Sequence, residues 1–242
     1  MDQTLTIKQL LEAGLHFGHH SRRWNPKMKQ FIFGKRNGIF IIDLEKTLER
    51  LRIAYDVLRS VTESGKEVVF VGTKPQARPI IEEEAKRCGC CYVTVRWVGG
   101  ILTNFDVIAT RISRLAKLEQ LINQPQPATT KKETMRLQHE YRKLAKLFSG
   151  LQQLDHLPGA IFVVDPVREA TAVAEARRMK VPVIALIDTN GDPQKVDYPV
   201  PGNDDALRSI RLVTSVLANA VMEGKKQFDT EVMSAETQSE EK

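Results

Sequence analysis

The chain has 242 residues, of which 42% are hydrophobic and 27% are charged, and its formal net charge is +6. This length is enough for a full hydrophobic core, in one large domain or in one domain that carries an insertion. The sequence contains no apolar run of the roughly 18 residues that a transmembrane helix needs, and its polar start is unlike a signal peptide, so we expect a cytoplasmic protein without a membrane partner.

The first distinctive segment is basic and aromatic. Residues 16–42 contain no carboxylate and six cations, which are Arg22, Arg23, Lys27, Lys29, Lys35 and Arg36. Residues 31–42 predict a β-hairpin with Lys35 and Arg36 at its tip, and residues 21–29 predict an extended loop. Such a surface suits RNA, because cations neutralise phosphates while Arg and Trp planes stack on bases. A solvated basic loop without a partner is the alternative.

Alternating strands and helices follow, and they predict a doubly wound α/β fold with a mostly parallel five-stranded sheet. Four apolar runs are typical of buried parallel strands, and a fifth, proline-containing run indicates an edge strand. The five runs are residues 67–72, 91–95, 160–165, 181–188 and 197–202. Helical patterns at residues 43–65, 75–89, 165–180 and 204–226 lie between and after them. Asp43 and Asp165 are the expected N-caps of the first and third helices.

Residues 104–155 interrupt the alternation with two narrow apolar stripes joined by a proline-containing turn. Such stripes predict an antiparallel coiled-coil hairpin that projects from its domain. Its outer cations, which include Arg111, Arg114 and Lys117, indicate either a solvated helical face or a second contact with a polyanion or a protein. We therefore expect a core domain made of residues 1–103 and 156–226, the inserted hairpin, and an acidic, disordered tail at residues 227–242.

No motif in the chain indicates an enzyme. The first strand-to-helix turn, FVGTKPQARP, lacks both a dinucleotide-binding fingerprint and a P-loop, although Lys74 at a helix N-terminus could hold a single phosphate. No nucleophile motif is present either. Cys88, Cys90 and Cys91 have no second cysteine pair with which to complete a zinc site, so we interpret them as reduced, buried residues. The sequence predicts neither a required cofactor nor a small-molecule substrate.

A metal site is nevertheless compatible with four other residues. Asp188, Asp204 and Asp205 follow strands that should end at the same edge of a parallel sheet, and His19 could join them if the N-terminal segment crossed that edge. Three carboxylates and an imidazole could bind a structural Zn²⁺ or Mg²⁺. The alternative is that Asn203 and the Asp204–Asp205 pair cap the last helix.

Several long motifs resemble those of the bacterial-type small-subunit ribosomal protein S-two family. They include HFGHHSRRWNPKM, VVFVGTKPQA, RWVGGILTNF, VPVIALIDTNGDP and YPVPGNDDALRSI, and the resemblance runs from about residue 5 to residue 226. It implies a non-catalytic component of the 30S subunit that binds 16S rRNA, contacts other small-subunit proteins and supports docking of ribosomal protein S-one.

The resemblance also implies which residues meet RNA. Those of the basic segment come first, and they are Arg22, Arg23, Trp24, Asn25, Lys27, Lys29, Lys35 and Arg36. Lys74, Arg78, Arg96 and the hairpin cations Arg111, Arg114 and Lys117 come next. It further implies that the metal option at His19, Asp188, Asp204 and Asp205 is reasonable. Two other functions stay open, namely a nucleotide- or phosphate-binding enzyme that uses VGTKP and a protein-docking module that acts through the coiled coil.

Overall fold

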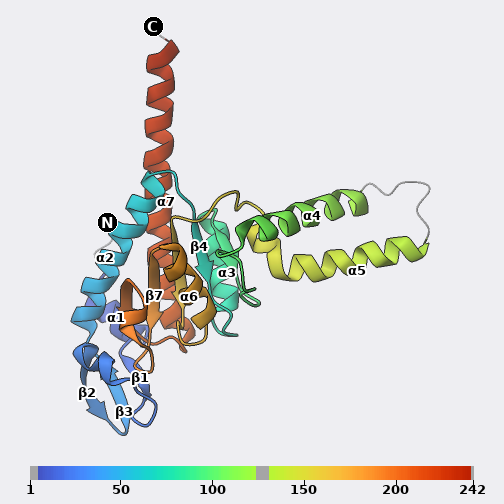
Figure 1. The fold of residues 1–242 in the computed structure, drawn as a ribbon. Helices are drawn as coiled ribbons and strands as arrows, with labels where there is room; N and C mark the ends of the chain where they lie inside the picture. The colour runs from blue at the N-terminus through green and yellow to red at the C-terminus, as the bar shows by residue number, and fades with distance from the viewer. Residues whose placement is uncertain (1–4, 124–130, 241–242) are drawn as a thin grey trace.

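The computed structural model describes residues 5–123 and 131–240 (Figure 1). Its centre is a parallel sheet with the strand order β5-β4-β6-β7-β8. The bounds of these strands are Val68–Val71 for β4, Cys91–Val93 for β5, Ala160–Val164 for β6, Val183–Ile187 for β7 and Tyr198–Pro201 for β8. All four neighbouring pairs are parallel, as their continuous burial predicts. The five-stranded parallel sheet expected from the sequence is confirmed.

Helices cover both faces of this sheet, so the fold is doubly wound. On one face, side chains such as Phe70 and Phe162 pack against α1, α2, α3 and α7. On the other face, Val71 and Val163 pack against α6 and the base of the α4–α5 hairpin. The helix bounds are Ile7–Glu12 for α1, Leu44–Glu63 for α2, Arg78–Arg87 for α3, Phe105–Asn123 for α4, Lys131–Phe148 for α5, Ala170–Met179 for α6 and Leu207–Glu240 for α7.

The N-terminal basic segment forms a small antiparallel sheet with the order β1-β3-β2. Strands β2 (Ile32–Arg36) and β3 (Ile39–Ile42) are the predicted hairpin, but its tip is Asn37–Gly38, both at positive φ, and Lys35 and Arg36 lie in β2 instead. The sequence reading missed β1 (Phe17–His20). The loop that we expected to be extended contains the 3₁₀ helix η1 (Pro26–Phe31), because Pro26 fixes its first turn and Asn25 caps it.

Two antiparallel helices, α4 and α5, project from the body as the predicted helical hairpin (Figure 1). The expected proline-containing turn lies largely outside the described residues. Ile112, Leu115 and Leu118 are buried along α4, and Arg114 pairs with Glu140 of α5 through two contacts of 2.9 Å. Packing therefore joins the two helices along one apolar stripe.

The turn that leads into this hairpin is fixed by a single buried carboxylate of α6. Glu175 accepts hydrogen bonds from Trp97 Nε1 at 3.2 Å and from the backbone N–H groups of Gly100, Leu102 and Thr103 at 2.8, 3.0 and 3.2 Å. The Thr103 hydroxyl adds a fifth bond at 3.1 Å. Burial disfavours the charged form of Glu175, yet these bonds outweigh that effect and lower its pKa.

Two helix boundaries differ from the prediction. Asp165, at a φ of 63°, accepts from the Arg168 N–H at 3.0 Å, so its side chain caps the turn at residues 166–169 and not the first turn of α6, which begins at Ala170. At the other end of the chain, α7 continues to Glu240, whereas we expected the last helix to end near residue 226 and a disordered tail to follow. Ala, Glu, Gln and Met favour helix, and no Gly or Pro follows Gly224 to end it.

Candidate RNA interface and the charged cluster that anchors it

The basic sheet, which we define as residues 16–42, presents its cations to solvent. Six of them are exposed side chains, namely Arg22, Arg23, Lys27, Lys29, Lys35 and Arg36. Trp24 is only partly exposed, because its ring packs on Phe40 with 4.8 Å between ring centroids. Phe33, which the sequence analysis did not single out, is 81% exposed and lies in β2 two residues before Lys35. No alternating pattern marks Phe33, because β2 pairs with β3 in an irregular register between Ile32 and Gly34.

The basic sheet is attached to the segment that follows the carboxyl end of β7. The Asn25 N–H donates to the Thr189 carbonyl at 2.8 Å, and Lys27 Nζ donates to Asp192 Oδ2, also at 2.8 Å. At Gly18, an added Cβ would come within 2.6 Å of Thr189 Cγ2, so only glycine permits this approach of β1. Of the predicted contact residues, Asn25 and Lys27 therefore also hold the basic sheet in place.

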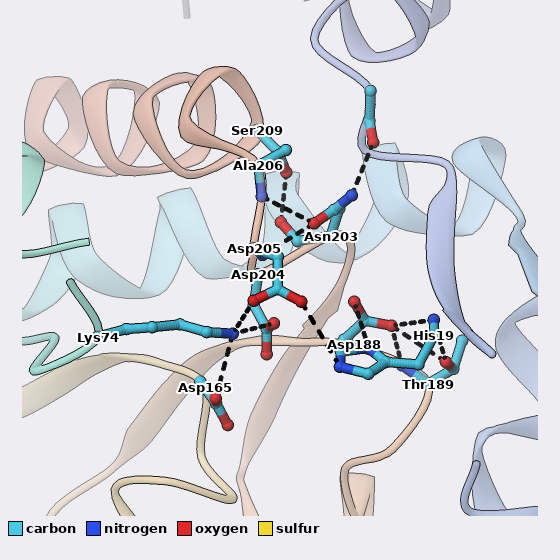
Figure 2. Close-up of polar contacts among 11 residues, drawn as sticks. His19, Lys74, Asp165, Asp188, Thr189, Asn203, Asp204, Asp205, Ala206 and Ser209 are labelled. Atoms are coloured by element: carbon cyan, nitrogen blue, oxygen red, sulfur yellow. Dashed lines mark hydrogen bonds and ion pairs between the residues drawn. The ribbon is translucent and has the colours of Figure 1, made fainter. Parts of the chain in front are cut away.

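Lys74 lies inside a cluster of carboxylates rather than on the basic surface (Figure 2). Its Nζ is 2.7 Å from Asp204 Oδ1, 2.6 Å from Asp205 Oδ1 and 3.3 Å from Asp165 Oδ2. Burial lowers the pKa of Lys74, but these carboxylates outweigh burial and raise it above its ordinary value. A charged ammonium held by three carboxylates is not available to a phosphate, so the predicted RNA contact of Lys74 does not fit its surroundings.

His19 reaches the same cluster from β1 (Figure 2). Its Nδ1 is 2.9 Å from Asp188 Oδ2, and its backbone N–H donates to Asp188 Oδ1 at 3.1 Å. The hydrogen bond to Asp188 is the largest cause of a raised pKa of His19. The Nε2 atom points toward Asp205, at 3.6 Å from Oδ2. The N-terminal segment therefore crosses the sheet edge, as the metal hypothesis requires.

The helix-cap alternative describes Asn203 only approximately. Its side chain accepts from the N–H groups of Asp205 and Ala206 at 2.8 and 3.0 Å, which closes the turn just before α7 begins at Leu207. The Asp204 and Asp205 side chains do not cap the helix; they face Lys74 and His19 instead. Burial, with Asp165 and Asp188 adding to it, raises the pKa of Asp204 to about 7 although Lys74 opposes the shift.

The donor set fits a small divalent cation of the Zn²⁺ type. Donor atoms of His19, Asp204 and Asp205 lie within 4.8 Å of one another. The buried Asp204 Oδ2 has no hydrogen-bond partner among the described residues, and it is the oxygen that Lys74 leaves free. Asp188 bonds the other imidazole nitrogen, and this is how a carboxylate orients a metal-binding histidine. His19, Asp204 and Asp205 would thus hold the ion, with Asp188 as the orienting group.

The position at which this fold ordinarily binds small ligands is filled by the chain's own side chains. The strand order changes direction between β4 and β6, and doubly wound folds bind ligands at such a point. Here Lys74 pairs with Asp165, and the Thr73 N–H donates to the buried Glu169 at 3.0 Å. Arg168 Nε donates to the Thr73 hydroxyl, also at 3.0 Å. Thr73, Lys74 and Asp165 are thus paired with other side chains of the protein at the switch point.

The remaining predicted cations are spread over other elements. Arg78, Arg96, Arg111 and Lys117 are exposed, and so is Arg114 although it pairs with Glu140. The structure therefore brings only the cations of the basic sheet together, and it leaves the others at the start of α3, before the hairpin and along α4. Asp165 and Glu169, which the sequence reading did not assign to a site, complete the cluster because they follow a strand that ends at the same edge.

Comparison with known proteins identifies the family. The model of the family described as "Ribosomal protein S2" matches residues 10–224. The small ribosomal subunit protein uS2 of Dictyoglomus thermophilum is 51% identical over 241 residues, which cover 98% of each chain. The protein of the same name from Dictyoglomus turgidum is 50% identical over the same length and coverage. No described helix is long and apolar enough to span a membrane. The chain belongs to the ribosomal protein S2 family.

Proposed function

We propose that this chain binds 16S rRNA through its basic sheet and thereby takes its place in the small ribosomal subunit. Membership of the family makes the chain a structural ribosomal protein of the small subunit in the cytoplasm, not an enzyme. The direct contact with rRNA is what we propose in addition. The observation that carries it is the gathering of six exposed cations on one small sheet that contains no carboxylate.

The charged cluster supports this assignment because the cation inside it is paired, whereas cations of the basic sheet are exposed and unpaired. Internal carboxylates neutralise Lys74, whereas Arg22, Arg23, Lys35 and Arg36 face solvent and make no ion pair with any described residue. Exposed, unpaired cations on a rigid sheet can replace the counterions of a phosphate backbone. Phe33 adds an open ring on which a base could stack.

We also propose, from the family resemblance, that the chain supports docking of ribosomal protein S-one. Subunits assembled without this chain should then lack that protein, and adding the chain back should restore it. Quantitative mass spectrometry of purified subunits measures the amount of ribosomal protein S-one with and without this chain. Subunits that retain ribosomal protein S-one in the absence of this chain would exclude the docking role and leave the rRNA contact unaffected.

The rRNA contact is tested with 30S particles that lack this protein. The double variant Arg22→Ala with Arg23→Ala should bind them more weakly, and its slope of log affinity against log salt should be shallower by about 1 to 2. The matched control replaces Arg52 and Lys226, exposed cations on α2 and α7, by alanine. An unchanged slope in the arginine variant, with unchanged thermal stability, would show that the basic sheet does not meet the phosphate backbone.

A further inference from the structure

The connection between β7 and β8 leaves part of one sheet face without a helix. Parallel strands are usually joined by a crossover that contains an α-helix. Here residues 188–197 contain only the short 3₁₀ helix η3 (Pro193–Lys195). Among the described residues, no helix therefore lies beside α6 on the β8 side of this face. The surface beside α6 remains open where another helix would ordinarily pack.

Two hollows occupy this surface, and Arg177 of α6 lines both of them. The first has a volume of about 390 Å³ and lies between α6 and the 190–195 segment, next to Asn25 of the basic sheet. The second has a volume of about 330 Å³ and lies at the other end of α6, against Pro182 and Tyr198. We call the two hollows together the α6 groove. It follows the whole length of the helix.

The lining of the α6 groove combines apolar surface with unpaired polar groups. Val173 and Val181 are almost fully buried at its base, and Val167 is 52% exposed at its rim. The Asn190 Oδ1 atom is buried and accepts no hydrogen bond from any described residue. Arg177 makes no ion pair within the described part of the chain. An occupant must therefore offer apolar side chains, an N–H donor for Asn190 and a negative charge for Arg177.

The length of the groove indicates the form of that occupant. The ten residues of α6 extend for about 15 Å. An extended chain covers the same distance with about five residues, at roughly 3.3 Å per residue. A short extended protein segment meets all three requirements, because its backbone supplies the N–H donor and its side chains can supply the apolar and acidic groups.

RNA meets these requirements less well. The cations Arg177, Lys180 and Lys195 share the lining with the carboxylates of Asp192 and Asp197. A phosphate backbone would meet those carboxylates as well as the cations, whereas the basic sheet offers cations alone. The apolar base of the groove also gives a ribose–phosphate chain nothing to bind.

We propose that the α6 groove binds an extended segment of another small-subunit protein, and that this segment carries an apolar side chain next to a carboxylate. The proposal rests on the role of this chain in the small subunit and adds a protein-docking surface along α6 that adjoins the basic sheet at Asn25. The apolar side chain fills the hollow beside Val173, the carboxylate pairs with Arg177, and a backbone N–H of the segment donates to Asn190.

A photo-crosslinking amino acid at position 167 tests this proposal in assembled particles. Full-length protein carrying it is incorporated into 30S subunits, the subunits are purified by sedimentation and irradiated, and the crosslinked partner is identified by mass spectrometry. Position 53, an exposed isoleucine on α2, carries the same crosslinker as the control. The expected result is a crosslink from position 167, and not from position 53, to an apolar and acidic segment of one small-subunit protein.

Charge variants give a second, quantitative measurement. Arg177→Glu should reduce the crosslink from position 167 about tenfold, because a charged hydrogen bond contributes about 1.5 kcal/mol or more. Arg178→Glu is the matched control, since Arg178 is the next residue on α6, is exposed and lines neither hollow. The proposal is wrong if position 167 crosslinks only to rRNA, to a second copy of this chain or to nothing, or if both variants behave alike. Failure of the labelled chain to sediment with 30S particles would instead refute its binding to the subunit, and the docking proposal with it.

Discussion

Replacing Glu175 by alanine should destabilise the turn from which the hairpin projects. The carboxylate accepts five hydrogen bonds from Trp97, Gly100, Leu102 and Thr103, at distances between 2.8 and 3.2 Å. Glu175 itself is only 8% exposed, so water cannot readily replace it as the acceptor. The variant would leave several buried donors without a partner.

The expected loss follows from the number and kind of these bonds. Hydrogen bonds to a charged group contribute about 1.5 to 3 kcal/mol each, but the five share one carboxylate and do not add. Removing one member of a buried charged network typically costs about 3 to 5 kcal/mol, and we expect the free energy of unfolding to fall by that amount. For a chain of this size, the melting temperature should fall by about 10 °C.

Urea denaturation of the isolated full-length chain measures this loss. Glu175→Gln should lose less than Glu175→Ala, because its amide oxygen still accepts from some of the donors. Glu49→Ala, at an exposed position of α2, is the control and should change stability by no more than about 0.5 kcal/mol. If Glu175→Ala were as stable as the control, the carboxylate would not be what holds the turn, and the reasoning from buried donors would fail.

Three further predictions concern pH, metal and backbone space. Because folding lowers the pKa of Glu175, its charged form contributes fully to the free energy of unfolding above the ordinary pKa of 4.5. This contribution is lost as the pH falls through the lower, folded-state pKa, so the parent and Glu175→Gln should converge in stability below pH 4.5. Zn²⁺ at a hundredfold excess over its dissociation constant should stabilise the parent by about 2.7 kcal/mol in thermal unfolding; His19→Ala should abolish this effect and His20→Ala should keep it. Gly18→Ala should cost about 1 to 3 kcal/mol in urea unfolding, whereas Gly34→Ala, with no atom within 4 Å of its added Cβ, should be nearly neutral.

The sequence was sufficient for the main sheet because four of its five strands are apolar on both faces. A run such as residues 160–165 can be buried only between two layers of helices, and this requirement alone leads to a doubly wound fold. The sequence also predicted that Asp188 and Asp204 lie at the same edge of the sheet, because the carboxyl ends of all strands in a parallel sheet lie on one side. The fold class and the approximate place of the charged cluster could therefore be predicted without knowledge of the tertiary contacts.

Pairing within the cluster could not be predicted in the same way. Lys74 resembled a phosphate ligand because it opens a helix after a strand, yet three carboxylates from two other loops surround it. Those loops are 90 or more residues away along the chain, and no local pattern reports such a contact. Trp24 illustrates the same limit, since its ring packs on Phe40 across the small sheet. Local composition could not distinguish a surface cation or ring from one that tertiary packing had already occupied.

The charged cluster explains why a fold that usually binds small ligands can act as a structural ribosomal protein. At the edge where a nucleotide would ordinarily lie, His19 of the basic sheet bonds to Asp188, and Asn25 bonds to the Thr189 carbonyl. The groups that end the strands are therefore used to hold a second, smaller sheet in a fixed orientation. A rigid attachment lowers the entropic cost of aligning several cations with a phosphate backbone. The internal contacts at the carboxyl edge of the main sheet thus orient the basic sheet, which is the proposed RNA surface.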